Sequence, residues 1–297
     1  MNIVVIGPGA IGALWAYRLH QAGHRVSVWS TKPNAYLALS LDDYPTIELE
    51  NNQPRTLQQA DLLLVTVKAW QVEQALLPIR REISSETMIA VMHNGMGTSD
   101  FLIKHFSTNP LLVATTTHGA YKLSDRQTCH TGKGHTQLGP LNSLGEQCQF
   151  LSPVLSHALP ECSWNDNIQL ALWQKLAINC AINPLTALHG IQNGDLASPS
   201  FTQTLTDVLS EVALVMHHQG FEVDANQLLD TVYQVIDKTA QNYSSMHQDI
   251  HHQRRSEIDY ITGHLLKVAK LHRLETPVNQ KLYNDIKHIE TVGRNHD

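Results

Sequence analysis

Short, uninterrupted apolar runs recur along the first half of the chain and are separated by segments with helical periodicity. Residues 3–6 form such a run, whose length suits a strand buried on both faces of a parallel sheet. The segments that we predict as strands are residues 3–6, 25–29, 61–67, 88–92, 111–117, 127–130 and 136–138. Helices are predicted over residues 13–22, 69–82 and 145–158. This alternation is typical of an α/β domain with a largely parallel sheet.

The pattern changes at Asn167, after which strand-like runs vanish and helical periodicity continues to the end of the chain. The predicted helices lie near residues 167–183, 199–219, 225–240, 247–272 and 278–292. We therefore predict an α/β N-terminal domain, residues 1–164, followed by an all-α C-terminal domain, residues 165–297.

A glycine motif lies between the first predicted strand and the first predicted helix. Its sequence is Gly7-Pro8-Gly9-Ala10-Ile11-Gly12. In a GxGxxG motif the first glycine permits a tight turn, the second lets the backbone approach a pyrophosphate, and the third lets the helix pack closely on the strand. Free N–H groups at the start of the helix then face the phosphates. Within this strand–loop–helix–strand unit the motif predicts dinucleotide binding, so the first domain is expected to be Rossmann-type.

The second predicted strand is followed by Ser30-Thr31-Lys32 rather than by an acidic residue. Proteins that bind NAD normally carry Asp or Glu here to hold the ribose 2′-hydroxyl. The segment has no carboxylate to repel a 2′-phosphate, and it offers one cation and two hydroxyls that could bind one. The sequence therefore favours NADP over NAD, with Thr31 and Lys32 as candidate ligands.

Two polar residues follow later strands of the predicted sheet. Lys68 comes directly after residues 61–67, and Asn94 follows residues 88–92 in a glycine-flanked turn. Ligands of open α/β sheets bind at the carboxyl ends of the strands, so both residues are candidates for the dinucleotide site. The structural alternatives are a solvated cation that caps a helix for Lys68 and an ordinary turn for Asn94.

The predicted helix at 167–183 carries Lys175, Asn179 and Asn183 in an otherwise apolar segment. A spacing of four keeps these side chains on one helical face. Pro184 is expected to end the helix just after the last of them. Buried ammonium and amide groups are costly without partners, so they belong either to a satisfied polar network in the core or to a ligand site.

In the long predicted helix, Glu257 borders an apolar stripe that contains Ile258 and Ile261, and Ser245 lies near the start of that helix. The structural interpretation makes Glu257 a surface residue and Ser245 a cap. The functional interpretation points both into a cleft between the domains, where dinucleotide-dependent enzymes hold their substrates.

Composition excludes several classes of protein. The 297 residues are 42% hydrophobic and 16% charged, with a formal net charge of −6, which fits a globular protein and gives no reason to expect nucleic acid as a partner. No apolar run is long enough for a membrane span, and the first residues lack a secretory signal. The four cysteines form no CxxC pair, which suits reduced thiols in the cytoplasm. Adjacent histidines such as His217 and His218 do not share a helical face, so no metal site is expected.

Several segments together make the chain resemble the ketopantoate reductase (2-dehydropantoate 2-reductase) family, the NADPH-dependent reductases of pantothenate biosynthesis. The matching segments are GPGAIG at 7–12, KAWQ at 68–71, HNGMG at 93–97, TTTH at 115–118, WQKLAINCAINPLTA at 173–187, QNG at 192–194, SSMHQDI at 244–250 and EIDYI at 257–261. Their order and spacing cover nearly the whole chain. The β-hydroxyacid dehydrogenases share the two-domain plan but not this set of segments.

The resemblance implies a role for individual residues. Lys175 matches the catalytic lysine that protonates the carbonyl oxygen, and Glu257 matches a residue that binds cofactor and aids catalysis. The positions that match substrate-binding residues are Lys175, Asn179, Asn183, Asn193 and Ser245. Those that match cofactor-binding residues are Gly7 to Gly12, Lys68, Asn94, Ala120 and Glu257. One position departs from the family, because its usual 2′-phosphate arginine falls at Thr31, beside Lys32.

Three hypotheses follow. The first is NADPH-dependent reduction of ketopantoate, a small-molecule substrate, by a cytoplasmic monomer or homodimer. The second is a reductase of the same architecture that acts on another 2-keto or 3-hydroxy acid. The third is an NADP-binding regulator without activity, which would be expected to have lost part of the Lys–Asn–Ser–Glu set that is complete here. A cation such as Lys175 suits the reductases, because negative charge develops on the ketone oxygen during hydride transfer.

Overall fold

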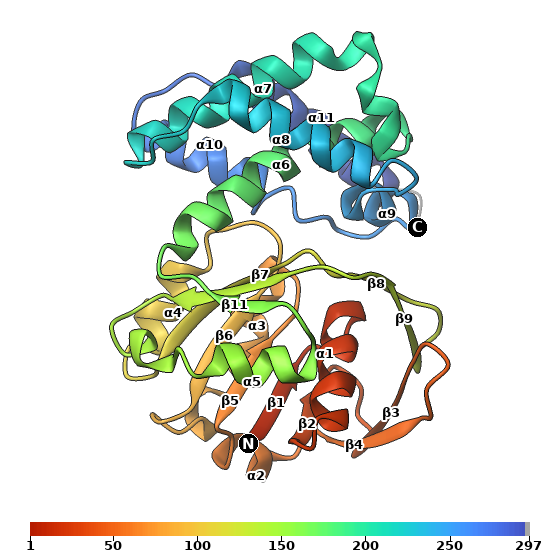
Figure 1. The fold of residues 1–297 in the computed structure, drawn as a ribbon, viewed down its shortest axis with the longest axis vertical. Coiled ribbons are helices and arrows are strands. Elements are labelled where there is room, and N and C mark those ends of the chain that lie inside the picture. The colour runs from red at the N-terminus through yellow and green to blue at the C-terminus, as the bar shows by residue number, and fades with distance from the viewer. Residues whose placement is uncertain (295–297) are drawn as a thin grey trace. The chain divides into compact units, whose positions relative to one another are not determined.

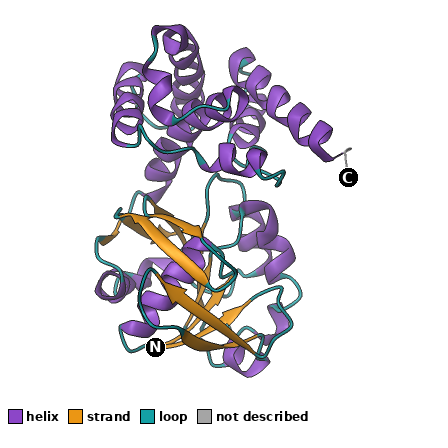
Figure 2. Ribbon diagram, turned by 90° about the vertical axis from the view of Figure 1, so that its right-hand side faces the viewer, coloured by secondary structure: helices purple, strands orange, loops and turns teal. Residues whose placement is uncertain are grey.

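The computed structural model describes residues 1–294 and divides into two compact units. The first unit contains residues 1–93 and 98–168, and the second contains residues 94–97 and the chain from Gln169 onward. The first combines strands with helices, whereas the second is helical (Figure 2). The predicted fold class is therefore confirmed. The last three residues of the predicted C-terminal domain lie outside the described residues.

The strands of the first unit form one sheet with the order β11-β10-β7-β6-β5-β1-β2-β4-β3-β9-β8 (Figure 1). Their bounds are β1 Asn2–Ile6, β2 Arg25–Trp29, β3 Tyr36–Leu41, β4 Ile47–Asn51, β5 Leu62–Val65, β6 Met88–Met92, β7 Leu111–Thr116, β8 Gly119–Lys122, β9 Gln127–Gly132, β10 Thr136–Pro140 and β11 Cys162–Trp164. The central strands β7, β6, β5, β1 and β2 run parallel. Since β1 pairs with β2 on one side and β5 on the other, the strand order reverses at β1, where α/β sheets bind their ligands.

Alternate residues of the central strands enter two different cores. Ile3 and Val5 of β1 pack with the helices α1 and α5, whereas Val4 and Ile6 pack with α2, α3 and α4. This period of two explains the uninterrupted apolar runs, because both faces of the sheet are covered. The helices and short 3₁₀ turns of the first unit are α1 Ala10–Gln21, α2 Pro54–Gln58, η1 Ala69–Gln71, α3 Val72–Leu76, η2 Arg80–Glu82, α4 Ser99–His105, η3 Gly145–Cys148 and α5 Leu151–Ala158.

Two helix predictions in the first unit were wrong in detail. The segment 69–82 is not one helix but η1, α3 and η2 in succession, and Pro78 lies between α3 and η2. Proline has no N–H to donate, and its ring clashes with the carbonyl four residues earlier, which accounts for the interruption. Likewise, 145–158 divides into η3 and α5. The sequence analysis also missed β3, β4, β8 and β11. In β3 and β4 buried residues alternate with more exposed ones, and β8 and β11 have only four and three residues.

The second unit surrounds one apolar core. Its elements are α6 Ile168–His189, η4 Asn193–Ala197, α7 Pro199–His218, α8 Ala225–Lys238, α9 Ser245–His251, α10 Thr262–Leu271 and α11 Pro277–Arg294. Residues of α6, α7, α8, α10 and α11 share a cluster in which Cys180, Val212 and Ile286 are completely buried. The predictions for α7 and α8 were correct to within about two residues.

Pro184 does not end the helix as predicted, because α6 continues through it to His189. An interior proline removes one backbone hydrogen bond and costs about 3 kcal/mol in a helix. Beyond Pro184, Leu185 and Ala187 are buried in the core of the second unit. We attribute the continuation to this burial, since tertiary packing routinely overrides helix propensity.

The long helix predicted over 247–272 is also wrong, because α9 and α10 are separated by ten residues without regular helix. Gln253 adopts a left-handed conformation with φ of 54°, which no α-helix accommodates. The Ser256 N–H then donates to a Glu290 carboxylate oxygen at 2.8 Å. Ile258 and Ile261 are nevertheless buried, so the apolar spacing that suggested a helix belongs to an irregular segment. Glu257 lies in this segment and not on a helix.

Within the described part of the chain, no helix combines the length and apolarity that a bilayer crossing requires. The same residues contain no group of three or more His, Cys, Asp or Glu side chains placed to hold a metal ion. All four cysteines are free thiols.

Candidate functional site

The glycine motif joins β1 to α1 at the carboxyl end of the central strands. The Gly7 N–H donates to the Trp29 carbonyl of β2 at 2.8 Å, and the Thr66 N–H donates to the Ile6 carbonyl at 2.9 Å. The Thr66 hydroxyl also donates to the Gly7 carbonyl at 2.9 Å. These bonds hold the loop between the ends of β2 and β5, at the point where the strand order reverses.

The backbone of the loop fits a pyrophosphate. A Cβ atom on Gly7 would lie 2.2 Å from a Val67 methyl carbon, and one on Gly12 would lie 2.3 Å from the Gly7 carbonyl oxygen. A Cβ atom on Gly9 would meet nothing closer than 3.9 Å, and Gly9 is exposed at the N-cap of α1. Gly7 and Gly12 therefore provide close packing, while Gly9 leaves open backbone at a helix N-terminus, where phosphates bind.

The segment after β2 is held firmly by two asparagines. Asn51, completely buried, donates to the Lys32 and Asn34 carbonyls at 3.0 and 2.7 Å, and Asn52 donates to the Lys32 carbonyl at 2.7 Å. The Ser30 hydroxyl donates to the Asn51 side-chain oxygen at 3.0 Å. Thr31 is exposed and Lys32 is partly exposed, so both candidate 2′-phosphate ligands are accessible on a well-supported turn.

Two further cofactor candidates lie in the first unit. Lys68 follows β5 by three residues and precedes η1, and its carbonyl accepts the Gln71 N–H at 2.8 Å. It therefore lies at the same carboxyl edge of the sheet as the glycine motif. Ala120 lies on β8, pairs with His130 of β9 and packs against the core that contains α1.

Asn94 lies in a loop that the chain contributes to the second unit. Its side-chain amide donates to a Glu257 carboxylate oxygen at 3.2 Å. The Met96 N–H donates to the Tyr260 carbonyl at 2.7 Å. Gly95 has φ of 79° and lies so close to Tyr260 that a Cβ atom would overlap its backbone. Residues 94–97 are thus attached to the segment that carries Glu257, which brings two of the predicted site residues together.

Lys175 and Glu257 interact electrostatically in the second unit. Glu257 is only 6% exposed, and Lys175 is partly exposed on α6. Desolvation by the surrounding protein lowers the pKa of Lys175 to about 8, while the Glu257 carboxylate acts in the opposite direction. An amine with this pKa can hold and release a proton near neutral pH, which is the property required of a general acid.

The two asparagines that follow Lys175 on α6 differ in their surroundings. Asn183 is 5% exposed, and its carbonyl lies 3.1 Å from the Thr186 hydroxyl. The side-chain nitrogen of Asn179 is buried and has no hydrogen-bond partner among the described residues. An unsatisfied buried donor is costly, so Asn179 has a hydrogen bond to offer one helical turn from Lys175.

Asn193 and Ser245 lie at the starts of η4 and α9 in the second unit. The Asn193 side chain donates to the Thr239 hydroxyl at 2.9 Å, and its side-chain oxygen is buried without a partner among the described residues. Ser245 is exposed at the start of α9, where Ser244 and not Ser245 caps the helix by accepting the His247 N–H. The Thr186 hydroxyl donates to Ser244 at 2.7 Å, which links α9 to the C-terminal half of α6.

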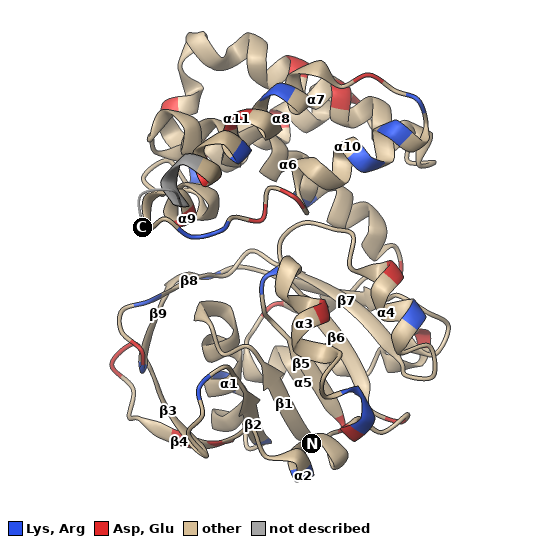
Figure 3. Cartoon of the chain, turned by 180° about the vertical axis from the view of Figure 1, so that it is seen from behind, with Lys and Arg blue, Asp and Glu red and all other residues tan. Residues whose placement is uncertain are grey.

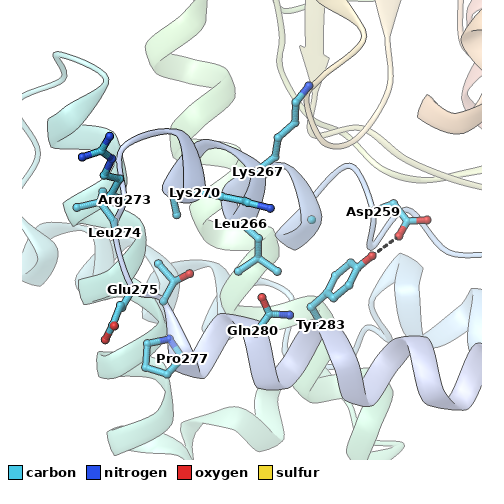
Figure 4. A pocket seen from close by; sticks show the side chains of 13 residues that line it. Asp259, Leu266, Lys267, Lys270, Arg273, Leu274, Glu275, Pro277, Gln280 and Tyr283 are labelled. Atoms are coloured by element: carbon cyan, nitrogen blue, oxygen red, sulfur yellow. Dashed lines mark hydrogen bonds between the residues drawn. The ribbon is translucent and has the colours of Figure 1, made fainter.

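A separate hollow of about 840 Å³ lies in the second unit between α10 and α11 (Figure 4). Tyr283 points toward Asp259 and donates to it at 2.8 Å. Arg255 and Lys287 also pair with this carboxylate, at 3.0 and 3.1 Å. The hollow is lined by none of the predicted site residues, and its Asp259 carboxylate is already paired with Arg255 and Lys287, so we do not assign the substrate to it.

The structure adds two residues that the sequence analysis missed. Lys122 and Asp125 lie on the hairpin of β8 and β9, and Asp125 pairs with Lys32 at 3.0 Å. Both basic and acidic residues are visible along this hairpin (Figure 3). Some 90 residues separate Lys32 from the hairpin, and no sequence motif connects them.

Comparison with protein families matches both units. Residues 3–143 match the family model described as Ketopantoate reductase PanE/ApbA, and residues 167–290 match the model described as Ketopantoate reductase PanE/ApbA C terminal. Together the two models cover most of the chain.

Curated relatives match over nearly the full length. The chain is 51% identical to a 2-dehydropantoate 2-reductase of Vibrio cholerae over 290 residues, which are 98% of each protein. It is 40% identical to the protein of the same name from Shigella flexneri over 295 residues, which cover 98% of this chain and 96% of the relative.

Solved structures share the fold. A PanE/ApbA family ketopantoate reductase from Ralstonia eutropha superposes with a TM-score of 0.87 at 24% identity, covering 98% of this chain and 99% of that one. A D-mandelate dehydrogenase solved with NADH and anilino(oxo)acetate gives a TM-score of 0.90 at 23% identity, with the same coverage.

Proposed function

The chain belongs to the ketopantoate reductase family, and we propose that it is a 2-dehydropantoate 2-reductase, which reduces ketopantoate to pantoate with NADPH in pantothenate biosynthesis. The proposal is supported by a relative of that name that is 51% identical over 98% of both chains. The observation that carries it in this molecule is the pair formed by Lys175, whose pKa is lowered to about 8, and the buried Glu257.

The first unit is proposed to bind the cofactor. Gly7 to Gly12 hold the pyrophosphate, with Pro8, Ala10 and Ile11 completing the turn into α1. Thr31 and Lys32 face the 2′-phosphate, and Lys68 and Ala120 provide further contacts. When bound, NADPH supplies the hydride that reduces the ketone.

The second unit is proposed to carry the chemistry. Lys175 attracts the ketone oxygen as negative charge develops on it and then gives that oxygen its proton, so the product is an alcohol. Glu257 favours the protonated form of Lys175 and is oriented by the Asn94 amide, which donates to it at 3.2 Å. This mechanism requires Asn94 and Glu257 to lie near the reacting carbon of the nicotinamide. The cofactor-binding role that the family resemblance implies for both residues agrees with that requirement.

Neutral amides are proposed to hold the substrate. Asn179 has a buried donor without a partner among the described residues, and Asn183, Asn193 and Ser245 supply further hydrogen-bonding groups. Amides and hydroxyls bind a carboxylate and a hydroxyl without cancelling the charge of Lys175. The proposal requires the nicotinamide held by the first unit to reach the substrate held by the second.

The test is NADPH oxidation by the purified chain with ketopantoate, compared with other 2-keto acids and with NADH. We expect the highest kcat/KM for the pair of ketopantoate and NADPH. A higher value for a different 2-keto acid would favour the alternative, a related NADP-dependent reductase. Absence of turnover with every 2-keto acid, in a chain that binds NADPH, would favour a regulator.

We place this activity in the cytoplasm, with a monomer or a homodimer as the working form. The free thiols of all four cysteines support a reducing compartment. Sedimentation of the purified chain would decide between the two oligomeric states.

A further inference from the structure

Two lysines from distant parts of the first unit meet at one acidic residue. The Lys32 ammonium lies 3.0 Å from an Asp125 carboxylate oxygen, and the Lys122 ammonium donates to the Asp125 carbonyl at 3.4 Å. Lys32 follows β2, whereas Lys122 ends β8. The hairpin of β8 and β9 thus brings a second cation to the turn where a 2′-phosphate is expected.

The turn that carries Lys32 is organised before any ligand binds. Asn51 and Asn52 both donate to the Lys32 carbonyl, and the Lys32 N–H donates to the Ser30 hydroxyl at 3.2 Å. The hairpin is anchored as well, because the Ser40 N–H donates to the Arg126 carbonyl at 2.9 Å. The backbones that support the two ammonium groups are therefore fixed relative to each other, so little conformational entropy is lost when they bind an anion.

The ammonium groups of Lys32 and Lys122 form a site that favours binding of an anion. Burial and the nearby Lys32 charge lower the pKa of Lys122, so its cationic form is less stable there than in water. The carboxylate that offsets the two cations is weakly held, since the Asp125 side chain is 90% exposed. Exposed ion pairs contribute little stability, so a more highly charged anion can displace this one at small cost.

We propose that Lys122 and Lys32 together bind the 2′-phosphate of NADP, and that Asp125 occupies this position only until the phosphate displaces it. The proposal rests on the proposed function, in which the first unit binds NADPH. It assigns to a pair of lysines the task for which the family uses the arginine that is replaced here by Thr31. Lys122 is then a specificity-determining residue, because NAD has a neutral hydroxyl at this position instead of a phosphate.

The experiment measures binding of NADP⁺, NAD⁺ and adenosine 2′,5′-bisphosphate to the full chain by titration calorimetry. In Lys122→Met we expect the Kd of NADP⁺ and of the bisphosphate to rise by about tenfold, and that of NAD⁺ to change less than twofold. Lys122→Arg should retain most of the NADP⁺ affinity. A Lys133→Met variant is the matched control, because Lys133 is an exposed lysine directly after β9 and is not placed at Asp125.

Asp125→Asn tests the displacement. Removal of the competing charge should lower the Kd of NADP⁺ a few-fold and leave that of NAD⁺ unchanged, and a weakened NADP⁺ complex would overturn this part of the proposal. Equal losses of NADP⁺ and NAD⁺ affinity in Lys122→Met, or no loss of either, would overturn the role of Lys122. Failure of the proposed function is distinguishable, because it would show as selective bisphosphate binding without ketopantoate reduction.

Discussion

The ammonium group of Lys175, the proposed general acid, is subject to two opposing influences on its pKa. Desolvation brings its pKa down to about 8, and the carboxylate of Glu257 limits the decrease. Without the carboxylate the pKa would be lower still, so a smaller fraction of the lysine would carry its proton at neutral pH. Without the desolvation it would hold its proton too tightly to give it up readily.

This balance predicts the pH dependence of ketopantoate reduction. The acid must be protonated in the free enzyme, so kcat/KM should fall about tenfold per pH unit above pH 8, the pKa of Lys175. Since Glu257 raises that pKa, Glu257→Gln should move the descending limb to lower pH. Initial rates across pH 6 to 10 measure both profiles. A limb that moves to higher pH in Glu257→Gln would contradict the sign of this interaction.

Substitution of Lys175 distinguishes a catalytic role for this residue from a structural one. Lys175→Ala should lower kcat by about 10²-fold or more, because the lost interaction is strongest in the transition state, while NADPH affinity barely changes. In Asn179→Ala we expect KM to rise more than kcat falls, as for a group that binds the ground and transition states about equally. A structural lysine would instead lower the melting temperature and reduce activity only in proportion to unfolding. A folded Lys175→Ala protein that turns over within a few-fold of the parent would end the catalytic assignment.

At the level of single residues, the sequence identified candidate site residues where their spacing along a local element distinguished them. Lys175, Asn179 and Asn183 stand out because polar residues share one face of an apolar helix, and α6 does carry them. Glu257 was recognised as a candidate, but its conformation was not, because a left-handed Gln253 and a hydrogen bond to Glu290 determine it. Lys122 could not be found at all, since its meeting with Lys32 depends on how a distant hairpin folds.

Among the elements, the loop at 94–97 shows how backbone geometry positions a functional side chain. Gly95 has φ of 79°, and a Cβ atom there would lie 2.4 Å from the Tyr260 carbonyl oxygen. Only glycine permits both the conformation and the close approach. The loop thereby carries the Asn94 amide to Glu257.

Gly95→Ala should therefore damage the site through the backbone. A left-handed conformation costs an alanine about 1 to 2 kcal/mol, and the overlap with Tyr260 should add about 1 to 3 kcal/mol. Gly220→Ala is the matched control, because Gly220 has φ of 84° and nothing lies within 4 Å of its added Cβ atom. Gly95→Ala should lose more than Gly220→Ala in two measurements, the free energy of unfolding in urea and kcat/KM. Equal losses of stability in the two variants would show that Tyr260 can shift away from the added Cβ atom at no energetic cost.

Helix and strand boundaries were predictable where burial and local propensity agree. Uninterrupted apolar runs identified β1 and β6 within one residue of their observed bounds, and β2 was predicted with its observed bounds although Ser27 interrupts its apolar residues. Pro184 shows the opposite case, because local propensity favours a helix end there and burial of Leu185 continues the helix. In β3, buried residues alternate with more exposed ones, and β8 is the last strand at one edge of the sheet, so neither requires a continuous apolar run.

At the scale of the molecule, the two units have separate apolar cores. The clusters around the sheet contain no residue beyond Trp164, and the fully buried members of the helical cluster all come from residues 173–286. A division into two domains was apparent in the sequence as a change from mixed to purely helical periodicity. The transfer of residues 94–97 to the second unit was not, because it depends on the contact between Met96 and Tyr260 rather than on periodicity.

Separate cores predict that the chain does not unfold in one step. Scanning calorimetry of the unliganded chain should give a calorimetric enthalpy larger than the van't Hoff enthalpy, as expected when two cooperative units melt in succession. NADP⁺ at about 100 times its Kd should stabilise the unit that binds it by about 2.7 kcal/mol, so one component of the transition should move to higher temperature more than the other. In Lys175→Ala the shift caused by NADP⁺ should persist, because the glycine motif and Lys32 belong to the first unit. A single transition with equal enthalpies, moving as a whole with NADP⁺, would instead mean that the exchanged loop at 94–97 couples the two cores into one cooperative unit.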